Sequence, residues 1–395
     1  MNILHINDKV EISGGVEVNI NNIIKYLEIE KISNYWIGIY NNGNYFLKFN
    51  FDNKVIFTQT LAKTIDFINK IIIKEKIDII HIHSISDPGI VSEIVKLAPV
   101  VKSMRDPRMF CPGQGKFWRK SELVCNIPFG IHCLFHAYSQ GCMNRHPKRV
   151  VNSMRNTAAE IVFSKNNYKA IIVMSKYMFD ESLKVGIPEN KLILNPHLTE
   201  IVEESLINIL DLSRSKRIVF IGRLSKTKGV HYFIKVGLEV LKTHKAVIFD
   251  IIGDGHDRAL FEKMIPDNLK NNFHFAGWKS PKDISEILQR GYMMIFPSIY
   301  PEAFGISGIE AMMHGKPVVG FDVGGVSTWL KNDETGYLVK VKDIKSMTEK
   351  VKILLDDSDL YLKMSKEARR TAIKEFSPEI HIKKLLEIYN KALEV

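Results

Sequence analysis

The sequence predicts an α/β protein of two successive doubly wound units, each a parallel sheet covered by helices. Three observations predict this fold class. Short apolar, β-branched segments alternate with stretches whose apolar residues recur every three or four positions, as in amphipathic helices. The strand-like segments are continuously apolar, which is typical of strands buried on both faces of a parallel sheet. The alternation restarts near the middle of the 395 residues, and a chain of this length can form two cores.

Composition excludes several classes of protein. The chain is 45% hydrophobic and 25% charged, which is ordinary for a globular protein and argues against disorder. No apolar run approaches the eighteen or so residues of a membrane span. The first residues, MNILHIND, are strand-like and lack the pattern of a cleavable leader. We therefore expect a cytoplasmic protein, with the inner face of the membrane as a further place of action.

The first predicted domain covers residues 1–195. Its strands are expected at 2–7, 35–40, 54–57, 77–83, 99–104 and 170–175. Between them, apolar spacing predicts helices such as those at 16–30 and 61–76. Prolines and asparagines in segment 186–198 indicate the hinge to the next domain.

The second predicted domain covers residues 196–377. Its strands are expected at 217–222, 246–253, 273–277, 293–298 and 317–323, with a helix after each. Ligands of open parallel sheets bind beyond the carboxyl ends of the strands, so we expect a site in a cleft where the two domains face each other. Residues 378–395 form an amphipathic helix that packs either back on the first domain or on the second.

Positive charge is concentrated in one segment. Of the net charge of +11, residues 101–150 supply +7, from nine Lys/Arg against two Asp/Glu. Such a patch suits an anionic membrane, a phosphorylated substrate or nucleic acid, and a merely solvated surface is the plainer alternative. Residues 106–147 show little helical periodicity, and we interpret them as an insertion after a strand.

All four cysteines lie in this insertion, at Cys111, Cys125, Cys133 and Cys142. Histidines lie among them, but no C-x-x-C pair is present. Buried free thiols, a structural zinc site and disulfides all stay open, with disulfides disfavoured in a cytosolic protein.

The segment PEAFGISGIEAMMHGKPVV, residues 301–319, carries two carboxylates after a strand. We place Glu302 in a loop and Glu310 about one turn into a helix. The free N–H groups at a helix start suit an anion or hydroxyl oxygens, and a carboxylate can accept paired hydrogen bonds from a diol such as ribose. Taken alone, the spacing favours two solvent-facing acids that complement the helix dipole.

Two further glycine-bearing turns follow strands. In FIGRLSKTKGVHYFI, residues 220–234, Gly222 permits close backbone approach, and Arg223 and Lys228 suit a diphosphate. After the first strand of the chain, Gly14 and Gly15 form a turn that admits phosphate or sugar, without the G-x-G-x-x-G pattern of dinucleotide sites.

Taken together, the motifs are specific. Six motifs follow one another along the chain: a strand with G-R-x-x-x-x-K-G, then G-D-G, F-x-G-W, P-E-x-F-G-x-x-x-x-E-A-M-x-x-G-x-P-V-V, G-G and N-D-x-T-G-Y-L-V. This series resembles the retaining glycosyltransferases of family 4 (glycosyl transferases group 1), which have the GT-B fold. The resemblance is dense over 170–345 and fainter, but collinear, over 1–170. It implies a nucleotide-sugar donor on the second domain, UDP-linked in preference to GDP-linked. The acceptor, a hydroxyl of a glycan or lipid-linked sugar, would bind the first domain.

The resemblance also implies residue roles. Arg223 and Lys228 would neutralise the donor diphosphate, Glu310 would hold the ribose, and Glu302 would hold the donor sugar. Backbone contacts to the donor would come from Gly14, Gly15, Gly222, Ala303, Phe304, Gly305 and Ile306. Negative charge that develops on the leaving diphosphate can be stabilised by cations without a metal. We therefore expect a metal-independent hexosyltransferase of cell-envelope polysaccharide synthesis that retains the anomeric configuration and needs no cofactor.

One departure from the family concerns the first domain. Relatives often carry His-Asp before a C-P dipeptide, whereas SMRDPRMFCPG places Arg105 there. Either Arg105 changes the donor pocket or another group takes the role of the histidine. His81 and His83 are the nearby imidazoles, and we expect them to point to opposite faces of their strand.

Three other functions compete with sugar transfer. A GT-B relative that hydrolyses or epimerises nucleotide sugars would turn over donor without acceptor. A non-catalytic glycan-binding partner would use the basic insertion for assembly. A nucleic-acid protein with a zinc module is the least favoured, and we expect no nucleic acid among the partners.

Overall fold

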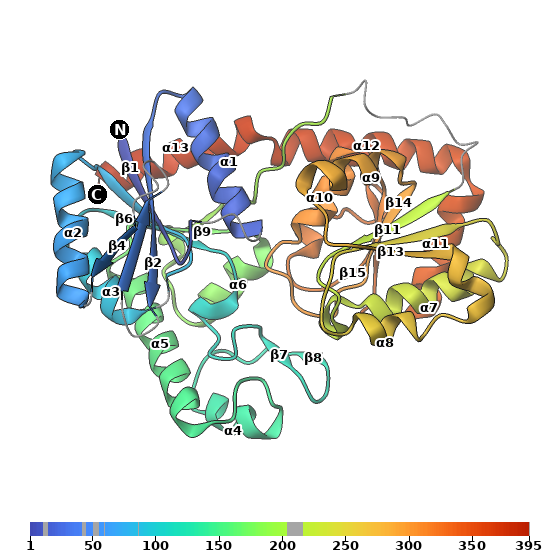
Figure 1. Cartoon of the computed structure of the whole chain (residues 1–395), viewed down its shortest axis with the longest axis horizontal. Coiled ribbons are helices and arrows are strands. Elements are labelled where there is room, and N and C mark those ends of the chain that lie inside the picture. The colour runs from blue at the N-terminus through green and yellow to red at the C-terminus, as the bar shows by residue number, and fades with distance from the viewer. Residues whose placement is uncertain are drawn as a thin grey trace. The chain divides into compact units, whose positions relative to one another are not determined.

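The computed structural model describes residues 1–10, 15–41, 45–49, 55–58, 60–85, 87–203 and 216–394, in two compact units (Figure 1). Unit 1 comprises Met1–His197 and Pro378–Val395, and unit 2 comprises Leu198–Ser377. The expected domain boundaries lie within two residues of these limits. The last helix, α13 (Pro378–Glu394), belongs to unit 1, where the Tyr389 hydroxyl lies 2.6 Å from Nδ1 of His81.

Unit 1 is built on an eight-stranded sheet of order β10-β9-β6-β5-β1-β2-β3-β4 in the part of the chain that the structure describes. Its strands are β1 (Asn2–Asn7), β2 (Ser33–Asn41), β3 (Tyr45–Phe49), β4 (Val55–Thr58), β5 (Ile79–Ile82), β6 (Val100–Met104), β9 (Ala170–Val173) and β10 (Leu192–Leu194). The central strands β5, β6 and β9 are buried along their whole length, which explains their continuous apolar sequences.

The expectation of a wholly parallel sheet is wrong at one edge. Strands from β10 to β2 pair in parallel, whereas β2, β3 and β4 pair antiparallel. A parallel connection needs a crossover of a dozen or more residues, and the sequence between these three strands is too short for one. Strands β3 and β10 are additions to the predicted set.

Helices lie on both sides of the unit 1 strands (Figure 1). They are α1 (Gly15–Ile29), α2 (Leu61–Lys74), α3 (Pro88–Ile94), α5 (Pro147–Asn166), α6 (Lys176–Lys184) and α13. Helix α2 shows why such segments fold: Thr60 caps its first turn by accepting from the N–H of Lys63, and Ile68, Ile71 and Ile72 form a buried face.

The insertion after β6 is more ordered than its sequence indicates. It contains η1 (Pro107–Met109), a small hairpin of β7 (Phe117–Trp118) and β8 (Leu123–Val124), and helix α4 (His132–Ser139). Among the described residues, no helix is long and apolar enough to cross a membrane.

Unit 2 has six parallel strands in the order β13-β12-β11-β14-β15-β16 among its described residues. They are β11 (Arg217–Ile221), β12 (Ile248–Ile252), β13 (Phe273–Gly277), β14 (Met293–Phe296), β15 (Val318–Phe321) and β16 (Gly336–Val339). In chain order this is 3-2-1-4-5-6, the arrangement of doubly wound nucleotide-binding sheets. The order reverses between β11 and β14, where such sheets open a crevice for a ligand.

Helices cover both faces of this sheet, with α7 and α8 on one side and α10 and α12 on the other (Figure 1). They are α7 (Val230–Leu241), α8 (Arg258–Glu262), α9 (Pro281–Arg290), α10 (Ile306–Met313), α11 (Ile344–Asp356) and α12 (Ser358–Phe376). Helix α9 begins with a capping box, in which Ser280 and Asp283 bond to each other's backbone N–H groups.

Candidate active site

The predicted donor residues of unit 2 lie in the two connections that follow β11 and β14, except for Ile306 and Glu310, which lie in helix α10. These strands flank the point where the strand order reverses. The loops contact each other directly, because the N–H of Ile299 donates to the carbonyl oxygen of Thr227 at 3.0 Å. Residues about 75 positions apart in sequence are thereby brought to one edge of one sheet.

Lys228 and Glu302 form an ion pair at this edge. The distance from Lys228 Nζ to Glu302 Oε1 is 2.6 Å, and the side chains are 36% and 10% exposed. The hydroxyl of Ser298 donates to the same carboxylate oxygen at 2.7 Å. A half-exposed cation next to a buried carboxylate can turn towards a ligand, so the pair can separate to engage two different groups.

Glycines hold these loops close together. Gly229 has φ of +75°, and a Cβ there would lie 1.8 Å from the carbonyl oxygen of Pro297. At Gly324, a Cβ would lie 2.5 Å from the carbonyl oxygen of Glu302, which also accepts from the N–H of Gly325 at 2.7 Å. The G-G motif after β15 therefore fixes the backbone of Glu302.

Helix α10 starts immediately after the Glu302 loop. Gly305 is its N-cap, with φ of +100°, and Ile306 is its first residue. Phe304 is buried, and its carbonyl oxygen accepts from the indole N–H of Trp329 at 2.6 Å. Ala303 is half-buried. The first N–H groups of a helix lack partners within the helix, so this turn can donate to a ligand.

Glu310 and Arg223 complete the expected donor set in unit 2. Burial raises the pKa of Glu310 to about 7, because desolvation disfavours the carboxylate. Arg223 follows β11 and Gly222, is exposed, and pairs with no acid among the described residues. The structure brings Lys228 and Glu302 into direct contact. Arg223 lies in the connection after β11, and Glu310 lies within α10.

The glycine turn of unit 1 is described only in part. Gly14 lies outside the described residues. Gly15 is the exposed first residue of α1. Their expected role in closing on a diphosphate stays a prediction.

Arg105, at the end of β6, lies in a network of buried polar side chains. It donates through Nη1 to Asn19 Oδ1 and through Nη2 to His83 Nδ1, each at 2.8 Å. His83 Nε2 lies 3.1 Å from His5 Nδ1, and His5 Nε2 lies 3.0 Å from Asn34 Oδ1. Since arginine only donates, His83 and His5 must both carry their proton on Nε2.

The expectation that His81 and His83 point to opposite faces is wrong. Their ring centroids are 4.0 Å apart. Residues two apart on a strand share a face, because side chains alternate with a period of two. The two-residue spacing of His81 and His83 is already present in the sequence, and it predicts a shared face.

His5, His81 and His83 also bring three ligand nitrogens within 4.8 Å of one another. Each of their ring nitrogens, however, already has a hydrogen-bond partner: His81 bonds to Tyr389 and Ser103, and the other two belong to the Arg105 network. Burial lowers the pKa of all three. These imidazoles are a neutral hydrogen-bonded network, and we assign no metal to them.

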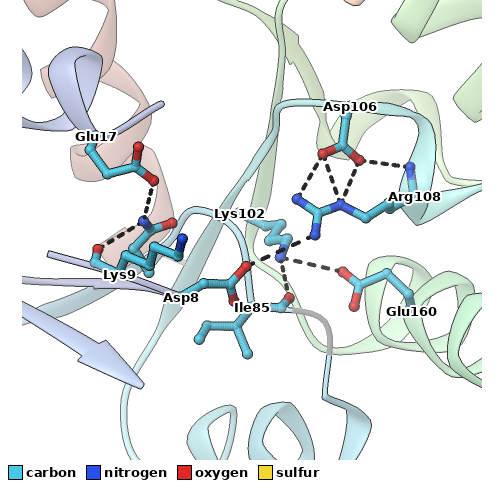
Figure 2. A network of polar contacts seen from close by, with 9 residues as sticks. Asp8, Lys9, Glu17, Ile85, Lys102, Asp106, Arg108 and Glu160 are labelled. Carbon is cyan, nitrogen blue, oxygen red and sulfur yellow. Dashed lines mark hydrogen bonds and ion pairs between the residues drawn. The ribbon is translucent and has the colours of Figure 1, made fainter. Parts of the chain in front are cut away.

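A pocket of about 80 Å³ opens beside Arg105 at the carboxyl ends of β5 and β6. Figure 2 shows four of the charged residues that line it, Lys102, Asp106, Arg108 and Glu160. Lys102 Nζ lies 3.8 Å from Glu160 and donates to the carbonyl oxygen of Ile85 at 3.0 Å. Arg108 pairs with the Asp106 carboxylate through Nε and Nη2. Sequence reasoning missed this site, although a lysine in the buried strand PVVKSM was a signal.

The four cysteines line one small apolar pocket in the insertion, together with His136. All four are free thiols and half-buried. Burial raises the pKa of Cys142 to about 11 and also raises that of Cys133. The structure brings the thiols together without a disulfide.

Comparisons with known proteins agree with the sequence motifs. The family model of glycosyl transferases group 1 matches residues 203–371. The alpha-D-kanosaminyltransferase of Streptomyces kanamyceticus is 30% identical over 273 residues, which are 65% of this chain and 70% of that protein. The chain belongs to the glycosyl transferases group 1 family.

Two further similarities extend this assignment. The poly(ribitol-phosphate) alpha-N-acetylglucosaminyltransferase of Staphylococcus aureus is 26% identical over 298 residues, which are 74% of this chain but only 57% of that protein. The structure of Anabaena HepE in complex with UDP has a TM-score of 0.68 at 15% identity, and the match covers 98% of this chain and 99% of HepE. The predicted GT-B fold is confirmed.

Proposed function

We propose that this group 1 family member transfers a hexose from a UDP-sugar to a hydroxyl of a glycan or lipid-linked acceptor, with retention and without a metal. The observation that carries this proposal is the contact between Lys228 and Glu302 at the switch point of unit 2. It joins the two motifs that the family shares, a cation for phosphate and an acid for hydroxyls. Similarity to a UDP-binding structure supports the choice of uridine.

The donor would separate the ion pair. Lys228 would turn to the diphosphate together with Arg223, and Glu302 would accept from hydroxyls of the sugar. Gly222, Ala303, Phe304, Gly305 and Ile306 would supply close backbone contacts. Two cations and a helix start next to the leaving diphosphate stabilise the charge that develops there, which removes the need for a metal.

Glu310 would hold the ribose as a carboxylate. A vicinal diol donates two hydrogen bonds, which stabilise the ionised form that burial disfavours. Gly14 and Gly15 of unit 1 would approach the diphosphate. The departing phosphate would accept the proton of the acceptor hydroxyl, which then attacks from the same face of the sugar.

An anionic membrane fits one surface of the insertion in unit 1. At α4, the apolar N-cap residue Ile131 and the helix residues Leu134, Phe135 and Tyr138 are 83, 37, 70 and 47% exposed. They recur at i, i+3, i+4 and i+7 and so form one stripe along the helix. Lys120 donates to the carbonyl oxygen of Tyr138, and the segment around α4 is basic. Apolar side chains flanked by cations suit the surface of anionic lipids.

Transfer is tested by donor turnover. Purified protein is incubated with UDP-glucose, UDP-galactose or UDP-N-acetylglucosamine in EDTA, with and without ribitol 5-phosphate or a lipid-linked sugar. We expect UDP release that depends on acceptor and a product in which NMR finds the anomeric configuration of the donor. Equal release without acceptor would instead identify a hydrolase, and loss of activity in EDTA would contradict metal independence.

Membrane contact is tested with vesicles. The variant Phe135→Ser should reduce sedimentation with phosphatidylglycerol vesicles, while Ile73→Ser, which removes an apolar side chain of similar exposure on α2, should not. Equal binding of both variants would remove α4 from the proposal.

A further inference from the structure

Arg105 is a buried cation, and no acid in the described part of the chain forms an ion pair with it. The residue is 8% exposed, and its hydrogen bonds go to the neutral groups of Asn19 and His83. Glu17 favours its charged form from a distance, without an ion pair among the described residues. Burial lowers the pKa of Arg105 only to about 10, so it is charged at neutral pH. Buried charges in proteins are normally paired, because desolvation is costly.

The surroundings of Arg105 are held neutral. His5, His83 and His197 are buried, and both burial and the charge of Arg105 lower their pKa. The directed hydrogen bonds from Arg105 through His83 and His5 to Asn34 fix the guanidinium in one orientation. A residue that only filled space would not need this support from β1, α1 and the residue that follows β5.

Part of the guanidinium has no partner. Two of its five N–H donors are used by Asn19 and His83, and the buried Nε has no hydrogen-bond partner. A buried donor without a partner is destabilising, because it has lost water without gaining a hydrogen bond. The side chain lines the pocket of about 80 Å³ at the ends of β5 and β6, which is several times the space one water needs.

The other charges around this pocket are already compensated. Lys102 pairs with Glu160, and Arg108 pairs with Asp106 and approaches Asp8 at 3.9 Å (Figure 2). Among the described residues that line this pocket, Arg105 is therefore the cation without an ion pair.

We propose that Arg105 binds an oxyanion of the acceptor, a phosphate ester, in this pocket of unit 1. This rests on the proposed transferase function and specifies its acceptor class. Nη1 and Nη2 each keep one N–H that Asn19 and His83 do not use, and these two donors suit two oxygens of one phosphate group. The pocket would then select acceptors that carry a phosphate near the reacting hydroxyl.

The test measures phosphate binding directly, without turnover. Isothermal titration of the full chain with inorganic phosphate and with ribitol 5-phosphate compares the wild type with Arg105→Gln, and with Arg155→Gln as an exposed control in the same unit. We expect at least tenfold weaker binding of both ligands in Arg105→Gln and unchanged binding in Arg155→Gln. UDP binding, which belongs to unit 2, should be unchanged in both variants.

Three results would overturn the proposal. Arg105→Gln could bind phosphate as the wild type does. It could instead lose UDP binding while keeping phosphate binding, which would assign Arg105 to the donor. Finally, neutral ribitol could bind as tightly as ribitol 5-phosphate to the wild type. If Arg105→Gln does not fold, Arg105→Lys keeps the charge but loses the fork, and should bind phosphate several-fold more weakly. Absence of sugar transfer with intact phosphate binding would reject only the proposed function.

Discussion

The charged groups of the two units are arranged in opposite ways. In unit 2, Lys228 and Glu302 pair where one partner is 36% exposed, at the edge of the sheet. In unit 1, Lys102, Glu160, Lys116 and Glu181 are almost fully buried. Exposed pairs contribute little to stability and are free to exchange partners, whereas breaking a buried pair is strongly destabilising. The charges of unit 2 are thus suited to ligand exchange, and those of unit 1 mainly to fixing a pocket.

The largest expected effect is on the stability of unit 1. Lys116 anchors the insertion, because its Nζ lies 2.7 Å from Glu181 on α6 while both side chains are under 4% exposed. Glu181→Gln leaves a buried ammonium without a counter-charge and should lower the free energy of unfolding by about 3–5 kcal/mol. Thermal and urea unfolding measure this loss. The exposed Glu189→Gln is the control, and equal stability of the two variants would contradict the distinction between the units.

The next effect is on activity, with little change in stability. Lys228→Ala removes a cation from the leaving diphosphate and should lower kcat by about 10²–10³-fold. Because Lys228 is partly exposed and Ser298 still donates to the Glu302 carboxylate, the melting temperature should fall less than in Glu181→Gln. Lys345→Ala, on the exposed face of α11, provides the matched control in steady-state kinetics. If Lys228→Ala strongly lowered the melting temperature and kept the kcat of the wild type, Lys228 would serve stability and not catalysis.

The two units also differ in how much of each site the sequence predicts. In unit 2, the site residues sit in two local motifs directly after strands, so Lys228 and Glu302 could be named before the strand order was known. In unit 1, Arg105 bonds to Asn19, 86 residues away, and only the adjacency of β5 and β1 brings them together. Helix α4 was missed because it has only eight residues, too few for the helical spacing of Leu134, Phe135 and Tyr138 to stand out.

A smaller effect is the pH dependence of donor binding that Glu310 should cause. Burial raises the pKa of Glu310 from its ordinary value near 4.5 to about 7. Its ionisation in the folded protein is thus disfavoured, and stability should fall as pH rises from 4.5 to 7. Ribose hydroxyls need the carboxylate, so affinity for UDP-glucose should rise about tenfold between pH 6 and pH 8.

Calorimetric titration with UDP-glucose between pH 6 and pH 8, with Glu310→Gln as comparison, tests this expectation. The variant should show a flat dependence apart from titration of the ligand itself. A wild type whose affinity does not change with pH would show that Glu310 is not the group that holds the ribose.

The smallest expected effect concerns the thiols of the insertion. Burial raises the pKa of Cys142 to about 11, so at pH 8 about one thiol in a thousand is ionised. Because the thiolate is the reactive form, a maleimide should label Cys142 slowly in the folded protein and fully after denaturation. Mass spectrometry of labelled peptides measures this order. Equimolar zinc in the purified protein, or rapid labelling of Cys142, would show that the four sulfurs are held as thiolates. The pocket of the four cysteines would then hold buried thiolates around a zinc ion. Unit 1 would contain buried charge there as well as at Arg105.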